Sequence, residues 1–328
     1  MQEFYPMGML VDGKWTKDDS SKFTKKGDFV RNKSTFRNWI KSDTGAEFPA
    51  EENRYVLYIT RSCPWAHRAL LYRGLKNLED LIQLELMGEG EQGYRHLEDS
   101  HVVPGTDHRL TFLHEVYTLA DSDYTGRCTV PTLWDAKNKT IVNNESADII
   151  RMLNTAFNDI AAASPDYCPP HLKDEIDEMN QYVYEKFNNG VYRAGFSTDQ
   201  EAYETAYDDV FEAMDRMESI LSEQRYLCGD QITETDWRAF PTLSRFDNAY
   251  HYVFKCNKKR LRDYPNLWAY TRDLYQQPKV ADLCFPEALK GGYWYLKRVN
   301  PLGTIPKGPE DVNFNEPHDR GRFSQAAE

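Results

Sequence analysis

Two apolar runs separated by a helix-like segment constrain the fold of this chain more than any other feature. The runs Tyr55 to Thr60 and Leu81 to Met87 have the length and composition of buried strands, and residues 64–75 between them are typical of a helix. A strand, a helix and a second strand in this order predict a βαβ unit with two parallel strands. We therefore expect an α/β core around residues 55–87.

The segments after residue 87 extend this unit. Apolar runs, turn residues and helix-start signals predict, in order, a loop-rich stretch (88–109), a helix (110–120), an antiparallel hairpin (129–134 and 139–142 around the turn 135–138) and a helix that begins near Glu145 and Ser146. The order β-α-β, α, β-β-α is the thioredoxin-like arrangement. The fold class we expect is therefore an α/β thioredoxin-like N-terminal domain followed by a different second domain.

The sequence becomes helical after a proline-rich break at residues 164–170. An apolar stripe with spacings of three and four residues, as one face of a packed helix requires, is formed by Tyr203, Tyr207, Val210, Met214, Met217 and Leu221. Thr233 followed by Asp236 is the pattern of a capping box, so another helix begins there. With further helices over 267–275 and 278–284, we expect an all-α C-terminal domain.

The expected divisions of the chain follow from these patterns. They are an N-terminal extension (1–47), the thioredoxin-like domain (48–164), the all-helical domain (165–310) and a C-terminal tail (311–328).

Composition narrows the classes of partner and compartment. The net charge of -12 argues against a nucleic-acid partner, because such binding relies on Lys and Arg to neutralise phosphates. No apolar run approaches the roughly 18 residues needed to span a bilayer, and the chain start lacks the features of a signal peptide. Six scattered cysteines without paired spacing are typical of reduced thiols. We expect a cytoplasmic protein with no membrane partner.

Cys63 is the strongest candidate for chemistry. It stands at the turn between the first strand and the helix, directly before Pro64, which suits the first helical position. The positive end of the helix dipole and the unpaired N–H groups there favour a thiolate. Ala66 occupies the place of a second cysteine in a Cys-x-x-Cys motif, so Cys63 would need an external thiol to resolve a disulfide. That external thiol points to glutathione.

Pro131 and the pair Glu145–Ser146 fit a peptide ligand. Pro131 interrupts a strand-like run, and a proline at this place of a thioredoxin-like fold is expected to be cis. The backbone groups of Val130 would then be open to an extended peptide. At the next helix start, Ser146 can donate to a carboxylate while Glu145 can accept from an ammonium group. Together these features are suited to a γ-glutamyl tripeptide.

The chain resembles the glutathionyl-hydroquinone reductases, the Xi class of cytosolic glutathione transferases, over roughly residues 33–310. The element Cys63-Pro-Trp-Ala-His-Arg68 is shared with Omega-class transferases, whereas Asn189-Gly-Val-Tyr-Arg-Ala-Gly-Phe196 and Arg245-Phe-Asp247 are typical of the Xi class. Further matching stretches are Phe36-Arg-Asn-Trp-Ile40, Gly126-Arg-Cys-Thr-Val-Pro-Thr-Leu-Trp-Asp135 and Asn144-Glu-Ser-Ala147.

This resemblance implies roles for particular residues. Cys63 would be the nucleophile, and the glutathione site would comprise Tyr94, Arg127, Val130, Pro131, Glu145 and Ser146. Tyr94 stands where the family usually has tryptophan, which changes the ring beside glutathione. The quinol site would use Tyr192, Tyr250 and a third tyrosine, either Tyr293, our choice, or Tyr295. The resemblance also implies a homodimer.

The implied reaction is the glutathione-dependent reduction of glutathionyl-hydroquinones through a mixed disulfide between Cys63 and glutathione. One alternative is an Omega-like thioltransferase or dehydroascorbate reductase, which would use Cys63 but not the three tyrosines. Another is a non-catalytic binding protein with the same fold. Cys63 and His67 have the i, i+4 spacing of a metal pair, but Cys63 precedes the helix and no further ligands cluster in the adjacent sequence, so we expect glutathione as co-substrate and no metal.

Overall fold

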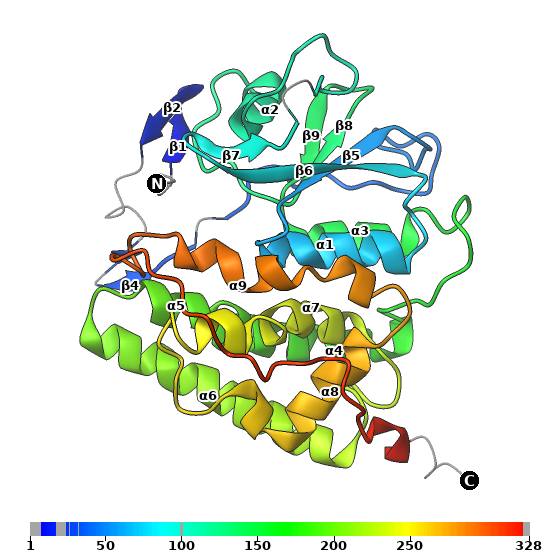
Figure 1. Cartoon of the computed structure of the whole chain (residues 1–328). Helices are drawn as coiled ribbons and strands as arrows, with labels where there is room; N and C mark the ends of the chain where they lie inside the picture. The colour runs from blue at the N-terminus through cyan, green and yellow to red at the C-terminus, as the bar shows by residue number, and fades with distance from the viewer. Residues whose placement is uncertain (1–7, 18–23, 26, 32, 99–100, 324–328) are drawn as a thin grey trace. The chain divides into compact units, whose positions relative to one another are not determined.

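The computed structural model describes residues 8–17, 24–25, 27–31, 33–98 and 101–323, which fall into two compact units (Figure 1). The α/β unit comprises the described parts of Met1–Ser20 and Asn32–Pro165. The helical unit comprises the described parts of Ser21–Arg31 and Asp166–Glu328. The expected fold class, an α/β thioredoxin-like region and an all-α region, is confirmed.

A five-stranded mixed sheet forms the centre of the α/β unit. Its strands, in spatial order, are β7 (Gly93–His96), β6 (Ile82–Gly90), β5 (Tyr55–Ile59), β8 (Thr132–Asp135) and β9 (Thr140–Asn143). β5 and β6 are parallel, and the other neighbours are antiparallel. The predicted βαβ unit and hairpin are therefore confirmed. All five residues of β5 are buried because the strand lies in the middle of the sheet.

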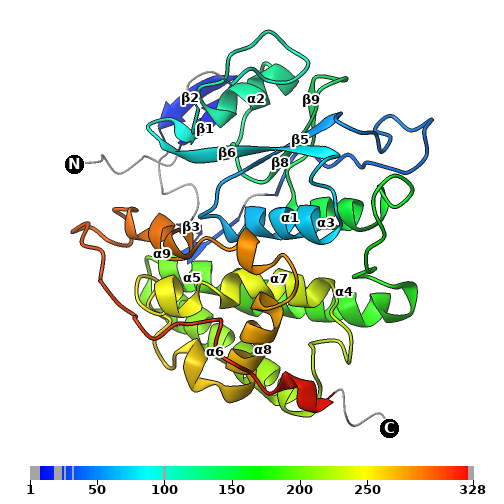
Figure 2. The same cartoon turned by 45° about the vertical axis from the view of Figure 1, so that its right-hand side comes forward.

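Helices cover both faces of this sheet. α1 (Pro64–Leu75) and α3 (Ser146–Thr155) lie on one face and α2 (Leu113–Ala120) on the other, as both views show (Figures 1 and 2). α2 begins three residues later than expected, because the Glu115 side chain accepts from the backbone N–H of Phe112 at 2.7 Å and thereby caps the helix there. A small hairpin, β1 (Gly8–Val11) with β2 (Lys14–Lys17), completes the unit.

The prediction of a loop over residues 88–109 was wrong for the first part of this range. β6 continues to Gly90 and turns back into β7, with Glu89 opposite Tyr94. Gly93 has φ +84, a left-handed conformation that favours glycine in such a turn. The segment lacks the alternation of apolar residues that would announce a strand, so the pairing is visible only in three dimensions.

The helical unit is built around one long helix, α6 (Gln200–Glu223). Its other elements are β3 (Thr24–Lys25), β4 (Asp28–Phe29), η2 (Pro170–Leu172), α4 (Lys173–Tyr182), η3 (Val183–Asn188), α5 (Gly190–Phe196), α7 (Glu234–Leu243), η4 (Phe246–Tyr250), η5 (Leu261–Asp263), α8 (Pro265–Tyr275), η6 (Ala281–Leu283), α9 (Pro286–Trp294) and η7 (Arg320–Phe323). Of the short η helices, η3 and η4 are π-helical.

Most sequence patterns of this unit correspond to observed packing. Val210, Met214, Met217 and Leu221 of the predicted stripe are fully buried. The capping box is present, since Asp236 accepts from the backbone N–H of Thr233 at 2.7 Å. The prediction of a helix over residues 278–284 was wrong, because only one 3₁₀ turn, η6, forms there.

Residues 27–31 pack within the helical unit although they precede the sheet in sequence. Phe29 is buried with its ring 5.3 Å from that of Phe196, and Asp28 forms an ion pair with Arg193. Among the described residues, none of the helices combines the length and apolar character needed to cross a membrane.

Candidate active site

Cys63 is the N-cap residue of α1. Its backbone is extended (φ -83, ψ 118), its carbonyl accepts from the N–H of His67 at 3.0 Å, and Pro64 occupies the first helical position. The first turn, Pro64 to His67, carries no carboxylate. The partly exposed thiol therefore lies at the positive end of the helix dipole, in the position expected from the sequence.

A cis peptide bond between Val130 and Pro131 lies next to this thiol. The Cys63 Sγ is 3.7 Å from the carbonyl oxygen of Val130. The expected cis geometry is confirmed. The structure thus brings Cys63, Val130 and Pro131 together from the start of α1 and the segment before β8.

Tyr94 and Arg127 belong to the same neighbourhood. Burial raises the pKa of Tyr94; Cys63 and Glu89 act on this pKa in the same direction, and Arg127 acts in the opposite direction. The electrostatic influence of both Cys63 and Arg127 on one phenol requires the three side chains to be close. Tyr94 projects from β7, the strand absent from the sequence-based expectation.

Glu145 and Ser146 stand at the start of α3. Glu145 is the N-cap, and its side chain accepts from the N–H of Ala147 at 3.2 Å and from the Ser34 hydroxyl at 3.0 Å. Ser146 is 3% exposed, and its Oγ has no hydrogen-bond partner among the residues that the structure describes. A buried hydroxyl without a partner costs free energy, so it is suited to a ligand acceptor that completes it.

Tyr117 links the two parts of this candidate glutathione site. Its hydroxyl donates to the carbonyl oxygen of Thr129 at 2.9 Å and accepts from the Asn144 side chain at 3.1 Å. Thr129 directly precedes Val130, and Asn144 directly precedes Glu145. One buried side chain of α2 therefore holds the cis-proline segment and the start of α3 in register. The sequence analysis did not single out Tyr117, because nothing local distinguishes it from other core tyrosines.

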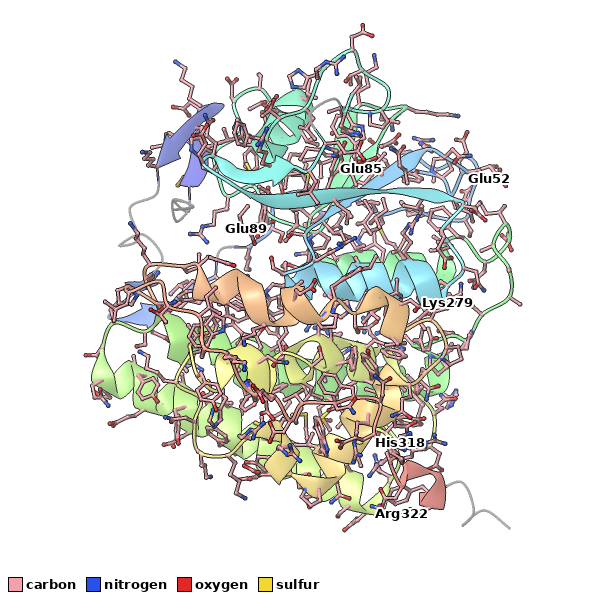
Figure 3. The ribbon with its side chains drawn as sticks, in the orientation of Figure 1. Glu52, Glu85, Glu89, Lys279, His318 and Arg322 are labelled. Atoms are coloured by element: carbon pink, nitrogen blue, oxygen red, sulfur yellow. The ribbon has the colours of Figure 1, made fainter. Side chains whose placement is uncertain are left out.

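Glu89 is a second residue that the sequence analysis missed. It comes from β6, the strand that also carries Glu85 (Figure 3). Its carboxylate accepts from the hydroxyl of Ser62 at 3.0 Å. Because Ser62 directly precedes Cys63, this bond fastens the turn that carries the thiol to the sheet.

Three tyrosines predicted from the family resemblance meet in the helical unit. The Tyr293 hydroxyl is hydrogen-bonded to that of Tyr192 and lies 3.5 Å from that of Tyr250. The ring centroids are 5.5 to 6.0 Å apart. Tyr295, the alternative third residue, is 41% exposed, so Tyr293 is the one that joins the cluster.

The surrounding sequence explains why these rings can converge. The Phe254 ring packs against all three tyrosines, with centroids 4.8 to 5.6 Å away. A Cβ on Gly195 would lie 2.2 Å from the Phe254 ring, so only glycine fits at that position. The π-helical η4, which carries Tyr250, is anchored by Asp247, whose carboxylate accepts from the N–H groups of Leu261 and Arg262.

The comparisons with known proteins agree with this arrangement. The chain matches the glutathione S-transferase N-terminal domain over residues 62–156 and the glutathione S-transferase C-terminal domain over residues 200–273. It is similar to the glutathionyl-hydroquinone reductase YqjG of Escherichia coli (strain K12), with 45% identity covering 96% of this chain and 98% of the relative. It is also 45% identical to the glutathionyl-hydroquinone reductase PcpF of Sphingobium chlorophenolicum, covering 92% and 96% of the two chains.

Solved structures give the same result. The Xi class glutathione transferase from Natrialba magadii has a TM-score of 0.88 at 40% identity, covering 98% of this chain and 99% of the other. The glutathione-bound structure of YqjG has a TM-score of 0.84 at 43% identity, covering 95% and 99%. The chain therefore belongs to the glutathionyl-hydroquinone reductase family, the Xi class of the glutathione transferases.

Proposed function

We propose that this chain reduces glutathionyl-hydroquinones to hydroquinones, with glutathione as the reductant. The observation that carries the proposal is the partly exposed Cys63 thiol at the start of α1, 3.7 Å from the carbonyl oxygen that precedes the cis-proline. The names of the relatives YqjG and PcpF, both glutathionyl-hydroquinone reductases, support it.

Glutathione binds, in this proposal, beside the sheet of the α/β unit. The peptide pairs with the backbone at Val130, and its γ-glutamyl end lies at the start of α3, where Ser146 donates to the carboxylate and Glu145 accepts from the ammonium group. The Ser146 hydroxyl, which has no hydrogen-bond partner within the described part of the chain, supports this placement. Arg127 supplies positive charge and Tyr94 an aromatic ring near the thiol.

The first chemical step transfers glutathione from the substrate to the enzyme. The Cys63 thiolate attacks the sulfur of the glutathionyl group, so that an S–S bond forms while the bond between sulfur and the aromatic carbon breaks. The electron pair of that bond stays with the aromatic carbon, which takes up a proton and leaves as the hydroquinone.

The second step regenerates the enzyme. The thiolate of a free glutathione attacks the glutathione sulfur of the mixed disulfide, and the Cys63 thiolate leaves. The products are oxidised glutathione and the starting enzyme. In sum, two electrons pass from two glutathione sulfurs to the aromatic ring.

We assign the hydroxyls of Tyr192, Tyr250 and Tyr293 to the hydroquinone part of the substrate. Hydroxyl donors on neighbouring helices can hold the phenolic oxygens and stabilise the negative charge that develops on the ring as the carbon–sulfur bond breaks. Their mutual hydrogen bonding supports the assignment, because it shows that three separate helices present their hydroxyls to one place.

The test compares two substrates in Tyr192→Phe, Tyr250→Phe and Tyr293→Phe. Each variant should reduce a glutathionyl-hydroquinone about tenfold or more slowly, because one donor to the developing charge is lost. Reduction of the mixed disulfide of glutathione with 2-mercaptoethanol should change little, since this substrate has no ring for the tyrosines to hold.

Tyr295→Phe is the matched control, because Tyr295 is exposed and only two residues from Tyr293. It should leave both rates unchanged. If the reduction rates of both substrates fell equally in the Tyr→Phe variants and the melting temperatures also fell, the three tyrosines would serve only to pack the helical unit. That outcome would favour the Omega-like thioltransferase reading.

The assembly and compartment belong to the same proposal. None of the six cysteines, all of which the structure describes, is in a disulfide, which is typical of proteins in a reducing compartment such as the cytoplasm. The family resemblance implies a homodimer. Light scattering of the purified chain should give twice the mass of a single chain. A concentration-independent monomer would contradict the homodimer without affecting the assignment of Cys63.

A further inference from the structure

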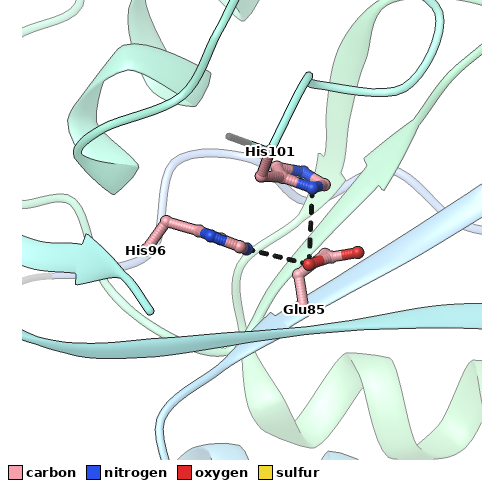
Figure 4. Close-up of side chains that lie close together, drawn as sticks. All are labelled: Glu85, His96 and His101. Atoms are coloured by element: carbon pink, nitrogen blue, oxygen red, sulfur yellow. Dashed lines mark hydrogen bonds and ion pairs between the residues drawn. The ribbon is translucent and has the colours of Figure 1, made fainter. Parts of the chain in front are cut away.

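Three side chains with metal-ligating atoms meet in the α/β unit: Glu85, His96 and His101 (Figure 4). Glu85 lies on β6, His96 ends β7, and His101 comes from the segment that leads to α2. We propose that these three residues bind a divalent ion of the late first-row metals, with Zn²⁺ the best fit. The spacing of a metal pair in the sequence singles out only Cys63 and His67, whereas Glu85 and the two histidines come together only through the fold.

The group is formed on one face of the sheet. Tyr58 of β5 is the register partner of Glu85, and its hydroxyl lies 3.3 Å from His101 Nε2. Tyr55, three residues earlier, packs from the opposite face against Phe157. The group therefore lies on the face of the sheet opposite to the one where Tyr55 packs against Phe157. The side chains are 2% (His96), 9% (His101) and 14% (Glu85) exposed, so the site is sheltered but remains open to solvent at the carboxylate.

The spacing of the ligand atoms suits a small ion. His96 Nε2 is 2.8 Å and His101 Nδ1 is 3.4 Å from the same oxygen, Glu85 Oε2. All ligand atoms lie within 4.8 Å of one another. A tetrahedral zinc site with bonds of about 2.0 to 2.1 Å has ligand–ligand separations of about 3.3 Å. The two imidazoles are stacked, with centroids 4.4 Å apart and an angle of 14° between their planes, so binding one ion in both ring planes requires at least one ring to turn about its side-chain bonds while the carboxylate withdraws.

Each proposed ligand already has an outer partner. His96 Nδ1 lies 2.9 Å from the carbonyl oxygen of Glu98, His101 Nε2 faces the Tyr58 hydroxyl, and Glu85 Oε1 accepts from Gln83. Metal-binding histidines generally use their second ring nitrogen in this way, and metal-binding carboxylates are also hydrogen-bonded. These contacts hold both rings beside the Glu85 carboxylate in the metal-free chain.

Proton positions can adapt to the ion. Without metal, His96 Nε2 lies within hydrogen-bond distance of the Glu85 carboxylate, at 2.8 Å, and the backbone N–H of Glu98 donates to His96 Nδ1 at 3.0 Å. When an ion binds to the nitrogens that face Glu85, the proton of His96 moves to Nδ1, 2.9 Å from the Glu98 carbonyl oxygen, and the proton of His101 to Nε2, which faces the Tyr58 hydroxyl.

The donor set selects the kind of ion. Two imidazoles and one carboxylate suit Zn²⁺, Co²⁺, Ni²⁺ or Cu²⁺, whereas Mg²⁺ and Ca²⁺ prefer oxygen ligands alone. Three protein ligands leave one position for water. The bound ion would join β6, β7 and the segment before α2, and it should therefore stabilise this side of the sheet against unfolding.

The experiment is a titration of the metal-free, full-length Cys63→Ser chain with Zn²⁺ by calorimetry and with Co²⁺ by visible absorption. Removing the Cys63 thiol prevents a thiolate from competing for the ion. We expect one strong site, tetrahedral Co²⁺ bands without a thiolate charge-transfer band, and a higher melting temperature when Zn²⁺ is present.

Glu85→Gln, His96→Gln and His101→Gln should each weaken Zn²⁺ binding by more than about 100-fold, the upper end of what removal of an outer partner alone produces. His108→Gln is the matched control, since His108 forms another histidine–glutamate pair, with Glu115, in the same unit. It should bind Zn²⁺ as tightly as the parent. Because His101 lies outside the strands, its substitution tests the ligand role even where His96→Gln lowers stability.

Three results would each overturn the proposal. They are the absence of saturable Zn²⁺ binding to the parent, unchanged affinity in all three glutamine variants, and a Co²⁺ spectrum dominated by thiolate ligation. In any of these cases the three residues form only a hydrogen-bonded structural group. None of the results depends on reductase activity.

Discussion

Cys63 differs from most other cysteines of the chain in the surroundings of its sulfur. Cys228, Cys256 and Cys284 are buried. Burial raises the pKa of Cys228 and of Cys284 to about 12, and it also raises the pKa values of Cys128 and Cys256. These four groups stay protonated near neutral pH and are poor nucleophiles. Cys63, by contrast, is partly exposed at a helix start.

We expect Cys63→Ser to abolish turnover of glutathionyl-hydroquinones while the fold remains intact, because a hydroxyl is a much weaker nucleophile than a thiolate near pH 7. Cys168→Ser, at another partly exposed cysteine, should retain full activity. Steady-state rates and the mass of the glutathione adduct measure both variants. Near-normal turnover in Cys63→Ser would exclude the mechanism.

Ser146 offers a second test at the level of one atom. Its buried Oγ has no partner among the described residues, so the hydroxyl contributes little to the ligand-free protein but can donate to bound glutathione. Ser146→Ala should weaken glutathione binding by about 1 to 3 kcal/mol and leave the melting temperature nearly unchanged. Calorimetric titration measures the affinity. Ser122→Ala, at an exposed position, is the control, and equal affinity in the two variants would move the γ-glutamyl site elsewhere.

The residues that sequence alone could identify are those with a local signature. Cys63 was recognisable because Pro64 marks the helix start, and Ser146 because it follows a strand and opens a helix. The tyrosines are different, since Tyr192 and Tyr293 are 101 positions apart. No periodicity or spacing connects them, and only the family resemblance linked them before the structure did.

Elements, too, depend on single side chains that connect them. Tyr117 of α2 bonds to the segment before β8 and to the residue before Glu145, so one hydroxyl connects the two segments to which we assign glutathione. The Thr132 hydroxyl, 3.1 Å away, adds to this group. Small displacements of either segment would misplace the peptide ligand.

Tyr117→Phe should therefore raise the KM for glutathione by about tenfold, the effect of losing one buried hydrogen bond of about 1.4 kcal/mol, with a smaller effect on kcat. A purely structural role predicts lower stability and equal effects on all kinetic constants. Tyr252→Phe, an exposed tyrosine of the helical unit, serves as the control. Kinetics at varied glutathione concentrations together with melting curves separate the two roles.

The elements that sequence patterns could predict are those with strong periodicity or clear ends. β5, α1 and α6 have both properties, and their observed bounds follow the apolar pattern closely. β7 forms because it pairs with β6, with Tyr94 opposite Glu89. This pairing depends on both strands of the hairpin and not on the sequence of residues 93–96 alone. The π-helical η4 depends in the same way on the distant N–H groups that Asp247 accepts. Such contacts cannot be seen in a local window of sequence.

At the scale of the whole chain, both terminal regions contribute to the helical unit. Residues 27–31 pack near Phe196, and the Arg31 guanidinium lies over the ring of Tyr192 at 5.1 Å. Near the other end, Phe314 is buried and packs against Trp268 and Tyr275. Residues 27–31 of the expected extension and Phe314 of the expected tail therefore add to the packing of the helical unit, whereas residues 8–17 and 33–47 belong to the α/β unit.

Arg320 attaches the C-terminal segment to the end of α6. It is fully buried, and its guanidinium donates to the carbonyl oxygens of Leu221, Gln224 and Arg225, each at 2.6 Å. These carbonyls stand at the end of α6, where the last turn of a helix lacks intrahelical donors. A cation at this end also interacts favourably with the helix dipole. Arg320 therefore acts as a C-terminal cap supplied from about a hundred residues away.

Arg320→Ala should lower the free energy of unfolding by about 1.5 to 3 kcal/mol, because charged hydrogen bonds are lost and buried carbonyls are left without donors. Arg322→Ala is the matched control two residues along the chain: its partner Asp319 is exposed, and removing a surface ion pair should cost less than about 1 kcal/mol. Urea unfolding measures both. Reductase activity at low temperature should be similar in the two variants, since neither arginine is placed in the site. Unfolding of Arg320→Ala at the same urea concentration as Arg322→Ala would show that the Arg320 hydrogen bonds add little to the free energy of unfolding. The stability of α6 would then come from its buried apolar face alone.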